Sequence, residues 1–244
     1  MVSLIEARVA VATACVDIDR AGLVLLAFGN TSMVLRDLGV VAIKPSGIPC
    51  AAMTPDDVVV VSLEDGRVLE GPLRPSSDTP THLELYRAFP TIRAIIHTHS
   101  AAATAWAQAR RPIPCLGTTH ADFFDGPVPV TRDMTAEEIR GDYEANTGSV
   151  VTGWFSAQHL DPDRLPGVLV ASHGPFTWGR TMADAVAVAI GLESIAAIAL
   201  NVLRINPEAL TISEALRGRH FGRKHGAQAY YGQNDWRSPA SSTD

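Results

Sequence analysis

The chain has 244 residues, the length of one large globular domain or two small ones. Hydrophobic residues make up 46% of it and charged residues 19%, which supplies a core and argues against general disorder. The formal net charge of −6 argues against a nucleic-acid partner, which a basic surface would suit.

The domain organisation is predicted to be simple. No Ser/Gly-rich or Pro-rich linker divides the chain, so we expect one domain over residues 1–233. Residues 234–244 are polar and aperiodic, which is typical of a flexible tail. Three widely spaced cysteines, Cys15, Cys50 and Cys115, match neither a disulfide framework nor a zinc knuckle. With no basic, apolar leader at the N-terminus, we expect a cytoplasmic protein with reduced thiols.

Short β-branched runs alternate with helical patterns along the chain. Residues 1–20 are predicted to form an amphipathic helix. Residues 32–45 predict a hairpin that turns at Asp37 to Gly39. Further strands are expected over 57–63, 93–99 and 167–173. The hairpin favours a mixed sheet over a strictly parallel one.

Helices are expected to cover this sheet. Thr79 is a plausible N-cap, with Pro80 at the first helical position, for a helix that Pro90 stops. Another helix should begin near Ser100. The apolar stretch over 185–203 is as long as a membrane span but contains Glu193 and Asn201. We therefore interpret it as a buried core helix, and expect no membrane partner.

Three histidines follow apolar strands. His97 and His99 lie two residues apart, so period-two alternation points both rings to one face, although two hydrogen-bonded histidines at a strand end would look the same. His173 ends another strand-like run. Three imidazoles suit a catalytic zinc site, which keeps a coordination position open. His120 is a rival candidate ligand.

Acidic and aromatic candidates remain ambiguous from spacing alone. Asp78 could reach the metal as a ligand or base, or serve only as a helix N-terminal charge. Asp122, in GTTHADFF, is either a surface acid or a general base. Tyr231 is one of two adjacent tyrosines, which more often simply pack.

Two segments have the composition of an anion site. Lys44, Ser46 and Gly47 in IKPSG offer a cation, a hydroxyl and backbone N–H groups. Ser76 and Ser77 in PSSD precede a helix and offer similar donors. The alternative is ordinary turn chemistry. There is no G-x-G-x-x-G or P-loop motif to support nucleotide binding.

Seven motifs in order resemble the class II aldolase and ribulose-phosphate 4-epimerase family. They are GNTS, IKPSG, PSSDTPTH, HTHS, GTTHAD, SHGPFTWG and RKHGAQAYYGQ, and they run from Gly29 to Gln233. The chain departs from the family pattern at Ala101 and Ala102, where bulkier polar residues are usual, and in the tail after Gln233. The first departure puts the fine shape of the site in doubt.

The resemblance implies a three-layer α/β/α fold with a central mixed, largely antiparallel sheet. It also implies one Zn²⁺ per subunit, with Mn²⁺ as another possibility, and a homotetramer with active sites between subunits. By motif position, the metal residues would be Asp78, His97, His99 and His173. The substrate-binding residues would be Gly29, Asn30, Lys44, Ser46, Gly47, Ser76 and Ser77. Asp122 and Tyr231 would be the acid/base pair.

The activity that this resemblance implies is an isomerase reaction on a phosphorylated pentulose: epimerisation of L-ribulose 5-phosphate to D-xylulose 5-phosphate by retro-aldol cleavage and re-addition. A class II aldolase acting on a phosphorylated ketose is the main alternative, although such aldolases typically carry a glutamate at the position of Asp78. A dehydratase acting on a thio-sugar phosphate and a non-enzymatic structural metal protein are more remote alternatives.

Overall fold

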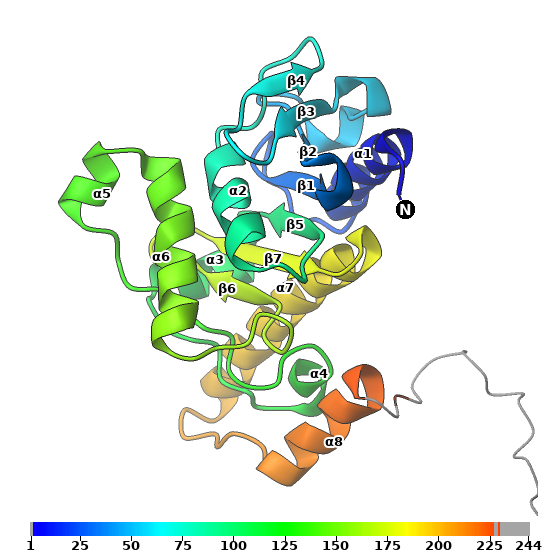
Figure 1. Cartoon of the computed structure of the whole chain (residues 1–244). Helices are drawn as coiled ribbons and strands as arrows, with labels where there is room; N and C mark the ends of the chain where they lie inside the picture. Colours follow the sequence, from blue (N-terminus) through cyan, green and yellow to red (C-terminus); the bar gives the residue numbers. More distant parts are fainter. Residues whose placement is uncertain (1, 227–228, 230–244) are drawn as a thin grey trace, which may run out of the picture.

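The computed structural model describes residues 2–226 and 229, and over these residues the chain forms a central seven-stranded sheet (Figure 1). The strands are β1 Asn30–Leu35, β2 Val40–Ile43, β3 Val59–Ser62, β4 Val68–Glu70, β5 Ala94–His97, β6 Gly167–Leu169 and β7 Pro175–Gly179. Tyr231 and the predicted tail over 234–244 lie outside the described residues.

The strand order is β4-β3-β2-β1-β5-β7-β6, and each neighbouring pair is antiparallel. The one parallel element among the described residues is an isolated bridge between Val130 and Leu169. The predicted hairpin is confirmed: β1 and β2 are joined through Arg36–Leu38, and Gly39 adopts a φ of 67°, which glycine tolerates. The α/β prediction with a largely antiparallel sheet is therefore confirmed.

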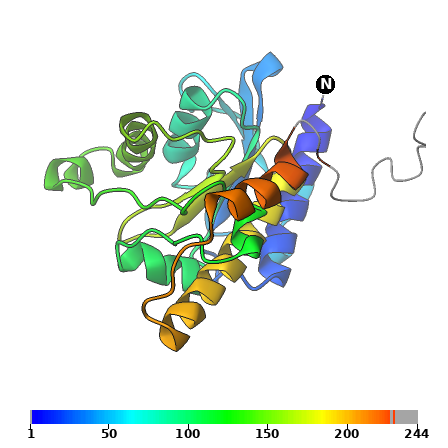
Figure 2. The same cartoon turned by 90° about the horizontal axis from the view of Figure 1, so that it is seen from below.

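Helices cover both faces of the sheet, as Figures 1 and 2 show together. On one face lie α2 Thr79–Ala88 and α6 Tyr143–Ala157, and on the other lie α1 Leu4–Arg20 and α7 Met182–Ile205. The remaining helices are α3 Ala101–Gln108, α4 Thr118–Ala121, α5 Ala136–Arg140 and α8 Glu214–His225. The result is the expected three-layer arrangement. Helix α2 begins one residue earlier than predicted, with Asp78 rather than Thr79 at the N-cap.

Period-two alternation divides the strands between two cores. Val34 of β1 and Ile95 of β5 join the cluster that includes α2 and α6, whereas Met33 and Ile96 join the cluster that includes α1. Fully burying one such side chain contributes roughly 1.5–3 kcal/mol. Because a shift of one residue would exchange the two faces, these apolar side chains fix the register that positions the ends of the strands.

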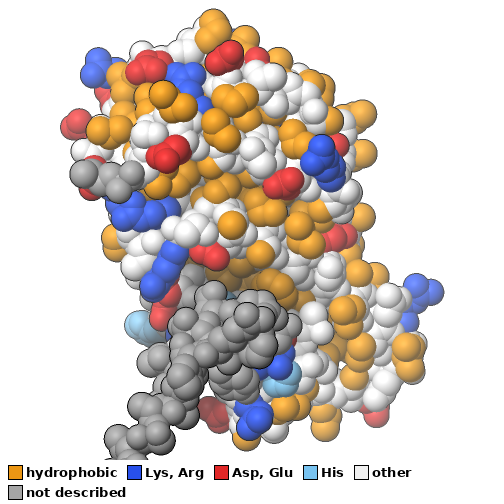
Figure 3. Space-filling view, turned by 90° about the vertical axis from the view of Figure 1, so that its right-hand side faces the viewer, with side chains coloured by type: hydrophobic (Ala, Val, Ile, Leu, Met, Phe, Trp, Pro, Cys, Tyr) orange, Lys and Arg blue, Asp and Glu red, His pale blue; other side chains and the backbone are white. Residues whose placement is uncertain are grey.

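Helix α7 is buried along one face only. By length and composition alone, this helix could cross a membrane, since the mean hydropathy of an 18-residue window is 2.1. Residues such as Leu192, Ile195 and Ala196 pack in the core, whereas Ile190 and Ile198 are exposed. Figure 3, viewed from the side that carries α1, shows further hydrophobic side chains on the surface with charged ones between them. The predicted core helix thus has a second, unburied apolar face.

A close contact between α2 and α6 gives a stability prediction. A Cβ added at Gly148 of α6 would lie 2.6 Å from the Cβ of Glu84 and 3.1 Å from the carbonyl oxygen of Thr81, both on α2. Gly148→Ala should therefore destabilise the fold by about 1–3 kcal/mol, because one helix must move away from the other. Gly153→Ala on the same helix meets no atom within 4 Å. It should stabilise the helix by about 0.5–1 kcal/mol in urea unfolding; equal effects would contradict the close packing.

Candidate metal centre

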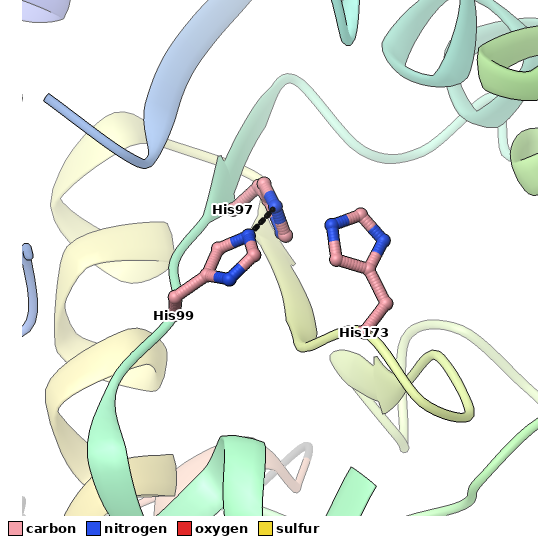
Figure 4. A group of neighbouring side chains, drawn as sticks. All are labelled: His97, His99 and His173. Carbon is pink, nitrogen blue, oxygen red and sulfur yellow. Dashed lines mark hydrogen bonds between the residues drawn. The ribbon is translucent and has the colours of Figure 1, made fainter. Parts of the chain in front are cut away.

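Three histidine rings converge at one end of the sheet. His97 is the last residue of β5, His99 follows two residues later, and His173 lies between β6 and β7. One ring nitrogen from each lies within 4.8 Å of the other two. Figure 4 shows the rings facing a common centre from two separate chain segments. This spacing suits three ligands of a single metal ion.

Strand pairing explains why the histidines meet. Strand β7 is antiparallel to β5, with Phe176 opposite His97, and their rings stack with centroids 4.1 Å apart. The turn that precedes β7 must therefore lie beside the end of β5. Within that turn, a Cβ at Gly174 would lie 2.8 Å from the carbonyl oxygen of Thr98. Glycine thus permits the close approach of the two segments.

The predicted position of His173 at the end of a strand is wrong. Strand β6 ends at Leu169, and the His173 N–H donates to the Val170 carbonyl in a turn, at 3.0 Å. Ser172 adopts a φ of 63° in this turn. The physical reason is that β6 and β7 are antiparallel neighbours, so the chain must reverse direction before Pro175. The turn, rather than a strand, delivers the third imidazole.

The three imidazoles are held in the neutral state that a metal requires. His97 Nδ1 lies 2.9 Å from the Pro175 carbonyl oxygen, which can only accept, so Nδ1 carries the proton and Nε2 is left with its lone pair. Nε2 lies 3.1 Å from His99 Nε2. Burial, then the charges of His173 and His99, hold the pKa of His97 well below its ordinary value. Burial also lowers the pKa of His99 and of His173.

The donor set fits a divalent metal ion. One nitrogen of each imidazole faces the same centre, and these three atoms lie within 4.8 Å of one another. Three neutral imidazole nitrogens match the ligand type of catalytic zinc sites. The residues present therefore suit the group that the sequence motifs imply.

Asp78 lies beside this group. Its Oδ2 is 3.9 Å from His97 Nε2 and accepts a hydrogen bond of 2.6 Å from Asn30 Nδ2. Although Asp78 is the N-cap residue of α2, its side chain makes no capping hydrogen bond. The carboxylate is directed to the histidines instead, which favours a metal-site role over a helix-capping one. Asn30 is placed there by its register opposite His97.

Two residues near the metal centre, Glu193 and Tyr143, were not predicted from the sequence. Glu193 of α7 accepts hydrogen bonds from the N–H groups of Ala102 and Ala103, at 2.8 and 2.9 Å, in the first turn of the helix that follows His99. The Tyr143 ring is 6.4 Å from that of His173. Burial raises the pKa of this tyrosine. Of these residues, only Glu193 stood out in the sequence, as an acid within an apolar stretch.

The two predicted anion segments lie side by side. Pro45 and Pro75 form a β-bridge, and the Ser46 N–H donates to the Arg74 carbonyl at 3.0 Å. A cavity of about 480 Å³ adjoins them, lined by Ser46, Pro72, Leu73, Arg74, Pro75 and Ser77. The contribution of Arg74 was not predicted. Segments 30 residues apart thus converge on one cavity, which is lined by both polar and apolar residues.

The other predicted substrate residues flank this cavity and the histidines. The Ser76 N–H donates to the Lys44 carbonyl at 3.1 Å, and Gly47 adopts a φ of 75°. Lys44 has a side chain buried to 2% exposure, and its Nζ donates to the Pro45 carbonyl at 3.1 Å. Gly29 has a φ of 100°, and a Cβ there would approach the His97 carbonyl oxygen to 3.0 Å.

Asp122 contacts α8 instead of joining the histidine group. Its carboxylate accepts hydrogen bonds from Arg223 Nη2 at 2.6 Å and from His220 Nδ1 at 3.1 Å. Burial alone would raise the pKa of Asp122, but the hydrogen bonds from Arg223 and His220 outweigh it and lower the pKa. Tyr231, its predicted partner, lies outside the described residues.

His120 is held by a structural hydrogen bond. Its Nε2 donates to the Gly126 carbonyl at 2.7 Å, and its ring packs against Phe124. Burial lowers its pKa to about 4. It does not belong to the metal-ligand group found among the described residues.

Sequence and structure comparisons bear on this arrangement. The profile of the Class II Aldolase and Adducin N-terminal domain matches residues 9–200. The chain belongs to this family. An L-fuculose 1-phosphate aldolase structure superposes with a TM-score of 0.75 at 24% identity, covering 89% of this chain and 95% of that one. The L-fuculose 1-phosphate aldolase of Glaciozyma antarctica PI12 gives a TM-score of 0.73 at 19% identity, covering 94% and 87%.

A further similar structure is that of YgbL from Escherichia coli, whose assignment as an aldolase, epimerase or decarboxylase is itself a proposal. It has a TM-score of 0.69 at 21% identity, and the match covers 89% of this chain and 99% of that one. At these identities the structural similarities establish the class II aldolase fold. They leave the reaction and the substrate of this member of the family to be argued from its own residues.

Removing any one histidine should weaken metal binding. His97→Ala, His99→Ala and His173→Ala should each lower Zn²⁺ content after dialysis, because each removes one ligand of a three-nitrogen chelate. Folding should largely survive, as judged by circular dichroism. His159→Ala, at an exposed position, serves as the control. Full metal occupancy in all three variants would contradict the assignment of the centre.

The lowered pKa of Asp122 gives a pH prediction. A carboxyl whose pKa is lower in the folded than in the unfolded state stabilises the fold above its ordinary value of 3.8, and this contribution is lost as the pH falls through the folded pKa. Asp122→Asn should therefore lower the Tm at pH 7, with a difference from wild type that shrinks below pH 3.8. The exposed Asp56→Asn is the control. A constant difference across this range would argue against the ion pair.

Proposed function

We propose that this protein is a metal-dependent, cytoplasmic enzyme that epimerises L-ribulose 5-phosphate to D-xylulose 5-phosphate. The observation that carries the proposal is the group of three neutral histidines with Asp78 beside it. The histidine nitrogens lie within 4.8 Å of one another, and Asp78 Oδ2 is 3.9 Å from His97 Nε2. Zn²⁺ is the metal we propose, with Mn²⁺ as a possible substitute.

The chemistry of the substrate requires a bond to carbon to break. The hydrogen on the fourth carbon is not acidic, because that carbon is not adjacent to the ketone. Removal of the proton from the fourth hydroxyl instead lets the bond between the third and fourth carbons cleave, with its electron pair passing toward the ketone. A metal held by the histidines would supply Lewis-acid stabilisation of the resulting negative charge. Rotation of the aldehyde and re-addition then invert the centre.

Retaining the aldehyde fragment between cleavage and re-addition is the task proposed for the anion segments. Ser46, Ser77 and Arg74 line the cavity of about 480 Å³, and they offer hydroxyl groups and a cation. These groups suit a phosphate. Lys44 would add charge from within the protein. A fragment held by its phosphate can turn about the bond next to the carbonyl without leaving.

We propose that Asp122 and Tyr231 are the acid/base pair and that they serve the histidines of a neighbouring subunit in a homotetramer. The position of Asp122 supports this, because its carboxylate binds His220 and Arg223 and does not belong to the histidine group of its own chain. Two groups are needed because protons are exchanged on opposite faces of the carbonyl. A closed cyclic arrangement would give every site the same pair.

An aldolase that cleaves a phosphorylated ketose and releases both fragments is the second candidate. It is supported by the names of two similar structures, which are L-fuculose 1-phosphate aldolases. The aspartate at position 78, where class II aldolases typically carry a glutamate, favours the epimerase. A shorter acid leaves its carboxylate closer to the helix terminus, in hydrogen-bond contact with Asn30.

Product analysis separates the two candidates. Purified protein loaded with Zn²⁺ should convert L-ribulose 5-phosphate to D-xylulose 5-phosphate, followed by NMR, without free glycolaldehyde phosphate. Chelator-treated protein and His99→Ala should show little turnover, because both lack the loaded centre. Accumulation of glycolaldehyde phosphate would favour the aldolase. Turnover that survives chelation would contradict a metal-dependent reaction of either kind.

A further inference from the structure

A buried chain of three polar side chains lies next to the metal centre. The Ser32 hydroxyl is 2.7 Å from His82 Nδ1 and 2.8 Å from the Tyr86 hydroxyl. All three residues are fully buried. Burial lowers the pKa of His82 to about 3, so its ring is neutral. None of these residues figures in the proposed reaction.

The hydrogen bonds among Tyr86, Ser32 and His82 can run in only one direction that uses both hydroxyl protons. If Tyr86 donates to Ser32 and Ser32 donates to His82 Nδ1, both hydroxyl protons are used. The reverse direction would leave the Tyr86 hydroxyl proton with no acceptor among the described residues. Nδ1 is therefore the acceptor, and Nε2 carries the proton of the neutral ring. His82 Nε2 is buried and has no partner among the described residues.

This unpaired donor lies on the side of α2 that carries Asp78. Asp78 and His82 are four residues apart on the chain, so they are neighbours on one face of the helix. On β1, Asn30 and Ser32 share a face in the same way. Asn30 bonds Asp78, and Ser32 bonds His82, so the two elements are joined by two adjacent cross-links.

Ring contacts through Phe176 also place His82 near His97, one of the candidate metal ligands. Its ring meets that of Phe176 edge-on, with centroids 5.9 Å apart, and Phe176 stacks on His97. Next to the same carboxylate, Asn30 Oδ1 is a second buried atom with no partner among the described residues, while its Nδ2 donates to Asp78. A buried donor and a buried acceptor thus flank Asp78.

We propose that His82 is a positioning residue for Asp78. Its Nε2–H donates to a water that in turn donates to Asn30 Oδ1 and to the Asp78 carboxylate, which gives that water three polar partners. The link fixes the orientation of the carboxylate toward the metal, as outer hydrogen bonds do at metal sites. This inference rests on the proposed metal centre and adds a residue to it.

Two substitutions test the roles of the two ring nitrogens of His82 separately. Asparagine can accept from Ser32 at the position of Nδ1 but has no atom at Nε2. Glutamine places an N–H group near Nε2 and loses the acceptor at Nδ1. His82→Asn should therefore weaken Co²⁺ binding about 10–100-fold in a chelator competition, whereas His82→Gln should stay close to wild type. The visible spectrum of bound Co²⁺ should change with His82→Asn only.

Tyr86→Phe is the matched control, because it breaks the same chain at its far end and leaves Nε2 untouched. It should lower the Tm of the metal-free protein but preserve Co²⁺ affinity. Equal affinities of His82→Asn and wild type, or a His82→Gln variant as weak as His99→Ala, would overturn the inference and leave the metal centre intact. If the asparagine variant fails to fold, a His82→Gln variant that binds Co²⁺ as weakly as His99→Ala would still overturn the inference. A wild-type protein that binds no Co²⁺ would overturn the proposed function as well.

Discussion

The antiparallel pairing of β1, β5 and β7 is the constraint on which the site depends. It sets Asn30 and Phe176 on either side of His97 in one row across the sheet. Strand β5 ends at this row, β1 begins at it and β7 begins one residue before it, so the segments that adjoin these strand ends converge. A shift of one residue in the β5 register would turn His97 toward the α1 face and exchange Ile95 and Ile96 between the two cores, which would disrupt the packing of both. Core packing therefore protects the geometry of the centre.

The elements with strong local signals could be predicted from the sequence, and so could the family. Two strand-like runs joined at Asp37 to Gly39 indicated the β1–β2 hairpin, and Pro80 with Pro90 bounded α2 to within one residue. The pairing of His97 with His99 followed from spacing alone. The match of the family profile over residues 9–200 confirms the class II aldolase family, which the ordered motifs indicated.

What could not be predicted depends on contacts between distant segments. His173 was assigned to a strand end, because its apolar run does not reveal that β6 must turn back to pair with β7. The place of Arg74 beside the anion segments depends on the pairing of Pro45 with Pro75, which the sequence does not reveal. Glu193 lies 90 residues from the helix terminus that it caps. No local pattern encodes such partners, since they arise from tertiary packing.

Two separate regions of the protein would suit the two anionic groups of the proposed substrate: the histidine group and the cavity lined by Arg74. The histidines are kept neutral by burial, so a divalent ion among them would keep most of its charge, with the Asp78 carboxylate beside it. That leaves a net positive centre for the charge that develops as the carbon bond breaks. The phosphate instead would meet hydroxyls, N–H groups and Arg74 in a separate cavity. In the proposed reaction the ion would not be needed to hold the phosphate, so its charge would remain available for the reacting end of the substrate.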